Sequence, residues 1–196
     1  MTDAAAGPAF YFDLFSPQAY LAAERVLQVL PVSAEWIPVS ASGLPGADGL
    51  DCFRCATDRE AFLERVSRAA ERQDLQPLRW PEPFPFDSTF AMLVATYARQ
   101  IGRTVPFAQA AFRQAFAGGR DLSVPDNVLI AAAACEMHPT AVIKAARLRS
   151  IAMRLDEATA LAARRGVRDV PAVRVSPGEV FHGDEAIERA ATALGG

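Results

Sequence analysis

Residues 10–20 of the chain read Phe-Tyr-Phe-Asp-Leu-Phe-Ser-Pro-Gln-Ala-Tyr, and this stretch decides the fold. The aromatic and apolar run Phe10–Phe15 predicts a buried strand. Ser16 and Pro17 follow it, and proline suits the first turn of a helix because its missing N–H has no partner there. The hydroxyl of Ser16 is therefore expected at a helix N-terminus, where backbone N–H groups favour a negatively charged atom such as a thiolate.

A helix and a second strand are expected next. Residues 19–30 place apolar side chains on one helical face, and Pro31 ends the pattern. Residues 35–39 then predict a strand. A strand, a helix and a strand in this order predict a parallel pair joined by a right-handed crossover.

Helical periodicity dominates the middle of the chain, and strands return only near its end. The expected helices cover residues 58–73, 88–101, 106–117, 125–135, 139–146 and 148–165. After Gly166, residues 170–175 alternate as a strand and 180–181 open a second one, which predicts a hairpin before a last helix over 186–194. The order β-α-β, helical block, α-β-β-α predicts an α/β fold with a mixed sheet and a large all-helical insertion.

Composition narrows the class of protein. The chain has 196 residues, of which 51% are hydrophobic, and this suits one compact domain or a domain with one insertion. A net charge of -3 offers no basic footprint for nucleic acid. No apolar run is long enough to cross a membrane, and the N-terminus lacks the pattern of a secretory signal. We therefore expect a cytoplasmic protein with no nucleic-acid or membrane partner.

Three cysteines leave two readings open. Cys52 and Cys55 match the Cys-x-x-Cys spacing of a redox pair or of half a zinc site. They follow a turn-rich loop instead of a strand, and no second pair of Cys or His matches them, so incidental thiols are favoured and no metal site is predicted. Cys135 makes the count odd, which argues against a disulfide framework.

Four motifs, in their order and spacing, give the chain a family resemblance. It resembles the 2-hydroxychromene-2-carboxylate isomerase and kappa-class glutathione transferase family, relatives of the DsbA oxidoreductases in the thioredoxin superfamily. The matching segments are Phe10-Tyr-Phe-Asp-Leu-Phe-Ser-Pro-Gln-Ala-Tyr-Leu21, Phe84-Pro-Phe-Asp-Ser88, Gly166-Val-Arg-Asp-Val-Pro-Ala-Val173 and Phe181-His-Gly-Asp-Glu185. The resemblance implies a thioredoxin-like domain formed by residues 8–40 and 160–196, and a helical insertion domain over 41–159.

The resemblance also implies roles for individual residues. In this family the serine of the Ser-Pro motif holds the sulfur of glutathione, a role that falls on Ser16 with Pro17 beside it. The residue before a cis-proline pairs with the backbone of glutathione, a role that falls on Val170 with Pro171. The glutamyl end of glutathione is received at the last helix, here by Asp184 and Glu185.

Three departures from the family pattern bear on the ligand. The family commonly has Tyr where Gln18 stands, and Asn where Asp87 stands. Its last motif has Asp-Arg where this chain has Glu185-Ala186, which removes a positive partner. Gln18, Trp80, Phe84 and Asp87 are the residues that we expect to line an apolar substrate pocket.

These residues predict an enzyme that uses glutathione on an aromatic or apolar electrophile, either as an isomerase or as a transferase. A homodimer is expected from the resemblance. A DsbA-like thiol–disulfide oxidoreductase is the second reading, although residues 16–19 contain no thiol. A thioredoxin-fold binding module that has lost glutathione is the non-enzymatic alternative, favoured by Gln18, Asp87 and Ala186.

Overall fold

The sheet is mixed and has four strands. The computed structural model describes residues 7–46 and 56–195. The strands β1 (Ala9–Phe12), β2 (Glu35–Pro38), β3 (Ala172–Ser176) and β4 (Glu179–His182) lie in the order β2-β1-β3-β4. β1 pairs with β2 in parallel, whereas the β1–β3 and β3–β4 pairs are antiparallel. This confirms the predicted mixed sheet, the parallel first pair and the C-terminal hairpin.

The first strand ends earlier than the sequence suggests. β1 stops at Phe12, so the prediction of a strand through Phe15 is wrong at that end. The chain turns at Asp13, whose main-chain carbonyl accepts the Ser16 N–H at 3.1 Å while its carboxylate accepts the Phe15 N–H at 3.3 Å. Local hydrogen bonds of an Asp side chain compete in this way with continuation of a strand.

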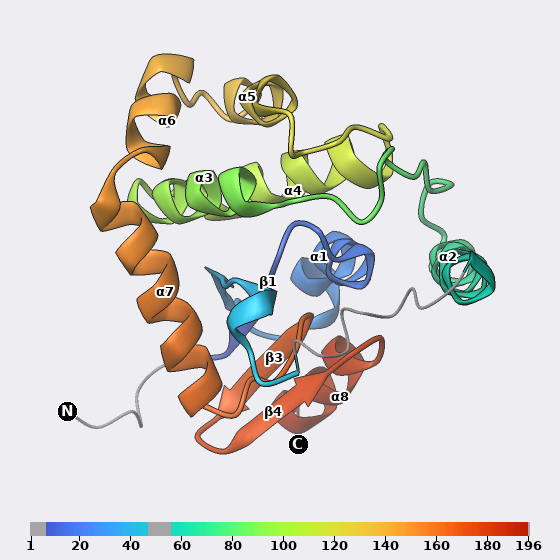
Figure 1. Ribbon diagram of the computed structural model, residues 1–196. Helices are drawn as coiled ribbons and strands as arrows, with labels where there is room; N and C mark the ends of the chain where they lie inside the picture. The colour runs from blue at the N-terminus through green and yellow to red at the C-terminus, as the bar shows by residue number, and fades with distance from the viewer. Residues whose placement is uncertain (1–6, 47–55, 196) are drawn as a thin grey trace.

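Eight helices occupy the described part of the chain, with one short 3-10 turn, η2 (Ala41–Gly43). The helices are α1 (Pro17–Val29), α2 (Ala56–Arg72), α3 (Thr89–Gln100), α4 (Thr104–Phe116), α5 (Pro125–Ala133), α6 (Pro139–Ala146), α7 (Arg149–Arg164) and α8 (Ala186–Gly195). All the predicted helices are present, and their observed ends differ from the predicted ends by a few residues. Figure 1 shows α3 to α6 stacked above α1 as the helical insertion.

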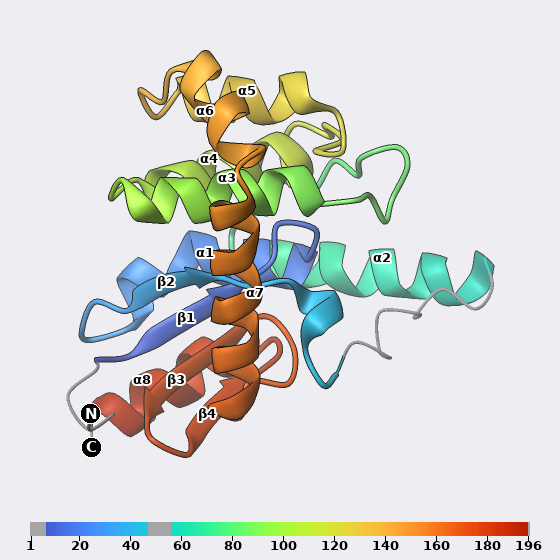
Figure 2. The same ribbon diagram turned by 60° about the vertical axis from the view of Figure 1, so that its left-hand side comes forward.

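The sheet is covered on both faces. α1 and α8 contact one another and pack on one face, whereas α7 covers the other (Figure 2). The core of the α1 face continues into the helical insertion without interruption, and the α7 face has its own smaller core around Tyr11 and Ala162. α7 runs through residue 160, the expected boundary between the two domains.

Two negative findings apply to the described residues only. None of their helices is long and apolar enough to cross a membrane. No three His, Cys, Asp or Glu side chains among residues 7–46 and 56–195 gather as metal ligands. Cys52 and Cys55 lie outside the described residues, and Cys135 is a buried free cysteine.

Candidate functional site

Ser16 caps α1, the position expected from the sequence. Its backbone is extended, and its Oγ accepts the Ala19 N–H at 3.2 Å. Pro17 has no N–H, and the Tyr20 N–H bonds to the carbonyl of Ser16 at 3.1 Å. The Gln18 N–H therefore remains as the first-turn donor that no described group accepts. The Ser16 hydroxyl hydrogen and this N–H both suit an anionic atom at the helix end.

Access to the Ser16 hydroxyl is narrow, because the residue is only 3% exposed. Gln18 is half-buried beside it, on the first turn of α1. A ligand would reach the hydroxyl with a small atom and not with a bulky group. A sulfur atom at the end of a single methylene meets this condition.

The loop before β3 contains the expected cis-proline. The Val170–Pro171 peptide bond is cis. The carbonyl of Pro171 accepts the Gly183 N–H at 3.1 Å, which fixes the loop to the turn between β4 and α8. On the other side, the Gly46 N–H donates to the carbonyl of Arg168 at 2.6 Å. The loop is therefore held from two directions.

One contact in this loop was not predicted. The Val170 N–H donates to Oδ1 of Asp169 at 2.7 Å. The motif that residues 166–173 resemble has Gly at the position of Asp169, and glycine has no carboxylate to make this contact. A ligand that pairs with the N–H of Val170 would have to displace this carboxylate.

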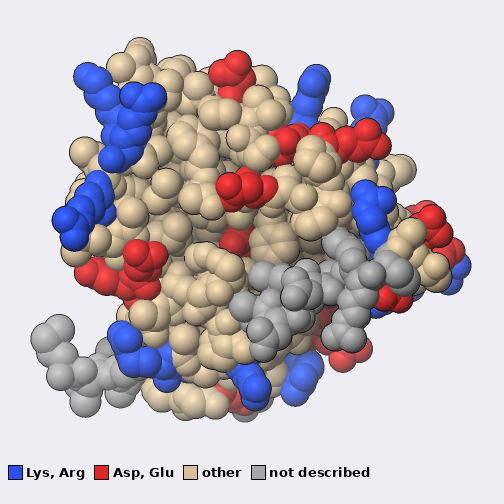
Figure 3. Space-filling model, in the orientation of Figure 1, with Lys and Arg blue, Asp and Glu red and all other residues tan. Residues whose placement is uncertain are grey.

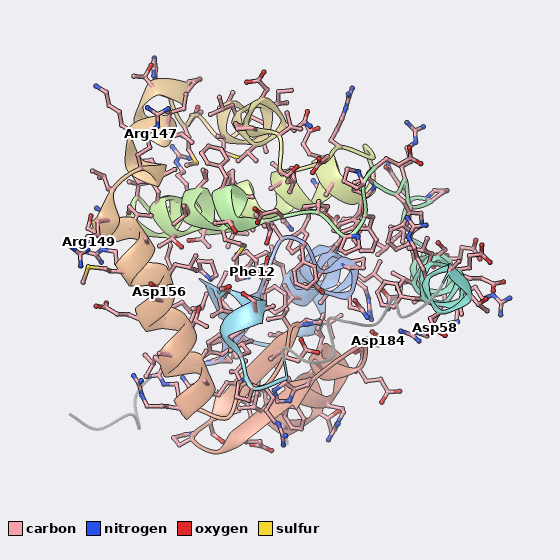
Figure 4. All side chains as sticks on the ribbon, in the orientation of Figure 1. Phe12, Asp58, Arg147, Arg149, Asp156 and Asp184 are labelled. Atoms are coloured by element: carbon pink, nitrogen blue, oxygen red, sulfur yellow. The ribbon has the colours of Figure 1, made fainter. Side chains whose placement is uncertain are left out.

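Asp184 and Glu185 occupy the turn that leads into α8, and both are exposed. Figure 4 shows Asp184 at the junction of β4 and α8. The backbone connection from Gly183 to Pro171 brings this turn to the cis-proline loop. Two exposed carboxylates here can accept an ammonium group, the charged end of an amino acid.

The sequence reasoning missed Asp13, which is buried at the start of the loop to α1 and 3% exposed. Its Oδ1 accepts the Ser88 hydroxyl at 2.7 Å, and its Oδ2 accepts the Ala41 N–H at 3.0 Å. Burial raises the pKa of Asp13, while the hydrogen bonds from Ala41, Ser88 and Phe15 act against this rise. A sequence signal existed, since an Asp directly after an apolar strand needs buried partners.

A cavity of about 220 Å³ opens next to Asp13, between η2, α3 and α7. Its lining includes Phe15, Ser40, Phe86, Asp87, Ser88 and Met92. Of the residues expected to form the substrate pocket, Asp87 lines this cavity. Hydrogen bonds from Thr89 hold the pKa of its exposed carboxyl below the usual range.

Trp80 and Phe84 lie in a packed aromatic cluster. Both contact Phe116 of α4, with ring centroids 6.2 Å apart in each pair. Phe84 is buried, and Trp80 is half-buried at the edge of the cluster. The cluster joins the 77–88 segment to α4, and a substrate role for these two rings stays a prediction.

These features define a thioredoxin-fold protein whose first helix begins with a serine in place of a thiol. The DSBA-like thioredoxin domain family model matches residues 9–195, and the chain belongs to this family. No curated protein matches the sequence.

Solved structures agree on the fold. A 2-hydroxychromene-2-carboxylate isomerase is similar with a TM-score of 0.82 and 17% identity, over 96% of this chain and 94% of the other. A probable DsbA oxidoreductase from Streptomyces coelicolor has a TM-score of 0.75 and 15% identity, over 95% of this chain and 87% of the other. The cytosolic disulfide reductase DsbM from Pseudomonas aeruginosa, in its structure with GSH, has a TM-score of 0.68 and 13% identity, over 96% of this chain and 97% of the other.

Proposed function

We propose that this protein is a glutathione-dependent isomerase or transferase that acts on an aromatic or apolar electrophile. The observation that carries the proposal is the start of α1. There, Ser16 presents a hydroxyl hydrogen beside the Gln18 N–H, which no described group accepts. The absence of cysteine from residues 16–19 argues against thiol–disulfide exchange at this helix.

The described residues offer hydrogen-bond partners for both the thiol and the ammonium group of glutathione. Ser16 would donate to the sulfur and keep it deprotonated, since a hydrogen bond and a helix N-terminus both favour the charged form. Asp184 and Glu185 would accept the ammonium group, and Val170 would bind the backbone. When bound, glutathione would supply a thiolate that adds reversibly to a conjugated carbon of the electrophile.

The cavity beside Asp13 is where we place the electrophile. Phe15, Phe86 and Met92 give it apolar walls, and Ser88 and Asp87 give it polar groups. Burial raises the pKa of Asp13, whose carboxyl group lines the same cavity. This arrangement suits an apolar substrate approached by a thiolate.

The 2-hydroxychromene-2-carboxylate isomerase relative and the structure of DsbM with GSH support the same reading. We infer further that the protein works in the cytoplasm as a homodimer. The structural neighbour DsbM is named as a cytosolic protein, which supports this location. Sedimentation velocity at micromolar concentration checks the dimer, and a species of 21.0 kDa alone would contradict it.

The test is a calorimetric titration with reduced glutathione, followed by ultraviolet absorbance of the bound thiolate. We expect Ser16→Ala to keep the fold, to lose the thiolate absorbance at neutral pH, and to bind about tenfold more weakly, the cost of one hydrogen bond to a charged group. Ser150→Ala, at an exposed serine near the start of α7, is the matched control and should change neither. Unchanged absorbance in Ser16→Ala would remove Ser16 from the mechanism.

A second candidate function, a binding module that no longer takes glutathione, is favoured by the hydrogen bond from Val170 to Asp169. If glutathione displaces this carboxylate, Asp169→Ala should strengthen binding by about threefold to tenfold, the value of one ordinary hydrogen bond. Asp126→Ala, at an exposed position on α5, serves as the control. Absence of binding in the unmodified protein and in Asp169→Ala would favour the second candidate.

A further inference from the structure

Arg174 is a buried cation in the middle of the sheet. It lies opposite Ala9 of β1 and Val180 of β4, and the residue is 1% exposed. Residues two apart on a strand share one face, and Ala172 packs in the core between the sheet and α7. Arg174 therefore lies on the α7 face, on the opposite side of the sheet from α1 and α8. A buried charge is costly unless it is paired.

The guanidinium of Arg174 is not paired within the described part of the chain. Its Nε and Nη1 are buried and have no hydrogen-bond partner. No carboxylate of the described residues forms an ion pair with it. Buried donors in folded proteins almost always have partners, so we expect Arg174 to take an acceptor from outside the described residues.

A cavity of about 510 Å³ opens in front of Arg174, between the end of α7 and the β3–β4 hairpin. Its volume exceeds that of several water molecules, at about 30 Å³ each. Figure 3 shows basic side chains at the lower end of α7, where this cavity lies. The polar side chains of its lining belong to Arg164, Arg165, Arg168, Arg174 and His182.

The charge of this lining has one sign. None of the described residues that line the cavity is Asp or Glu. Two carboxylates lie near this lining in the sequence. Asp169 accepts the Val170 N–H and also acts electrostatically on His182, and Glu179 accepts the Ser176 hydroxyl at 3.1 Å. His182 accepts the Arg168 N–H through Nε2 at 3.0 Å, so its Nδ1 carries a hydrogen that can be donated.

The dipole of α7 accounts for part of the cluster but not for Arg174. Arg164 stands in the last turn of α7, where a cation is stabilised by the free carbonyls of the helix end. If Arg174 served the same purpose, its Nε and Nη1 would donate to those carbonyls, and they do not.

We propose that this cavity is a second binding site, which takes the phosphate group of a small molecule. The guanidinium of Arg174 would turn toward the cavity and donate a parallel pair of N–H groups to two oxygens of the anion, the fork geometry that matches phosphate. Arg164 and Arg168 at the exposed mouth would add charge. The site is on the α7 face of the sheet, and the proposal does not depend on glutathione binding.

The test is calorimetry on the full chain at constant ionic strength, with inorganic phosphate and phenyl phosphate as probes. We expect saturable binding of phosphate, weakened about tenfold by Arg168→Ser and undetectable in Arg174→Met. Arg149→Ser is the matched control, because Arg149 begins α7 at its opposite end (Figure 4) and should leave binding unchanged. Tighter binding of phenyl phosphate would identify an organic phosphate as the ligand, and equal binding would identify the free anion.

Stability gives a second readout that does not need the ligand. Removing an unpaired buried charge should raise the melting temperature of Arg174→Met above that of the unmodified protein in phosphate-free buffer. Phosphate should raise the melting temperature of the unmodified protein and leave that of Arg174→Met unchanged. A lower melting temperature for Arg174→Met in phosphate-free buffer, or no saturable binding of either probe at about 10 mM, would overturn the proposal.

Discussion

At the scale of single residues, the carboxylate of Asp13 holds three segments together at the start of α1. It accepts hydrogen bonds from Phe15 in its own loop, from Ala41 in η2 and from Ser88 before α3. The adjacent Leu14 N–H donates to Sδ of Met92 at 3.3 Å, so the same loop is also fixed to α3. The position of Ser16 depends on this set of contacts, because Ser16 follows in the same loop.

Asp13→Asn tests the role of this carboxylate. The amide would place a donor against the Ala41 N–H, so we expect the free energy of unfolding to fall by about 1–3 kcal/mol at neutral pH. Because burial raises the folded pKa of Asp13 above the unfolded value, protonation favours the folded state. The stability that this shift contributes is present below the ordinary value of about 3.9 and is lost as pH rises through the folded pKa.

Urea unfolding of both proteins at pH values from about 4 to about 8 gives the comparison. The stability difference between the unmodified protein and Asp13→Asn should widen as the pH falls. Exposed Asp156→Asn on α7 should lack this trend. A difference that narrows on acidification would mean that the folded state prefers the ionised carboxylate.

At the scale of elements, Phe116 joins the thioredoxin-like part to the insertion. Its ring stands 5.6 Å from Tyr20 of α1, 6.2 Å from Phe84 and 6.3 Å from Phe86, between ring centroids. Phe116 ends α4 and is fully buried. One side chain at the end of a helix therefore sets the distance between α1, α4 and the 77–88 segment.

Phe116→Ala should lower the free energy of unfolding by about 3–5 kcal/mol, the usual cost of deleting a fully buried phenylalanine ring. Denaturant unfolding followed by tryptophan fluorescence checks this, because Trp80 contacts the deleted ring. Leu148→Ala, at an exposed leucine, should cost less than about 0.5 kcal/mol. A loss below about 1 kcal/mol for Phe116→Ala would mean that the cluster does not hold the elements together.

At the scale of the whole molecule, the sheet and the insertion share one core. Phe12 of β1 meets Phe112 of α4 with centroids 5.9 Å apart. Arg113 of α4 forms two hydrogen bonds to Glu24 of α1, at 2.8 and 2.7 Å, across the same boundary. Residues that are distant in the sequence thus bury one another's apolar surface.

Unfolding should therefore occur in one cooperative transition. Near-ultraviolet circular dichroism reports the aromatic core, and the far-ultraviolet signal reports the helices of the insertion. The two should give one midpoint in a thermal scan. Two midpoints would show that the insertion and the thioredoxin-like part fold as separate units.

The sequence predicts the fold well because its signals are local. The Ser-Pro turn, the helical periods and the C-terminal hairpin each depend on neighbours in the chain, and the order of these elements leaves few topologies. The cis bond at Val170–Pro171 was also expected, from the family motif. The partners of Asp13 were not, because Ala41 and Ser88 are 28 and 75 residues away.

The burial of Arg174 and the hydrogen bond of Asp169 could not be predicted from local sequence signals either. An arginine in an alternating strand suggests an exposed side chain, and only the placement of α7 across the sheet buries it. The bond from Val170 to Asp169 depends on one side-chain rotamer. Neither fact can be obtained from the spacing of residues.

The contact of Gly46 with the cis-proline loop restricts which residues position 46 can hold. A methyl group on Gly46 would collide with the carbonyl of Arg168 and press on the side chain of Asp169. Even alanine at position 46 would have to push aside the loop that carries Val170. A mutation outside every proposed contact with glutathione could thus be mistaken in a genetic screen for the loss of a ligand-binding residue.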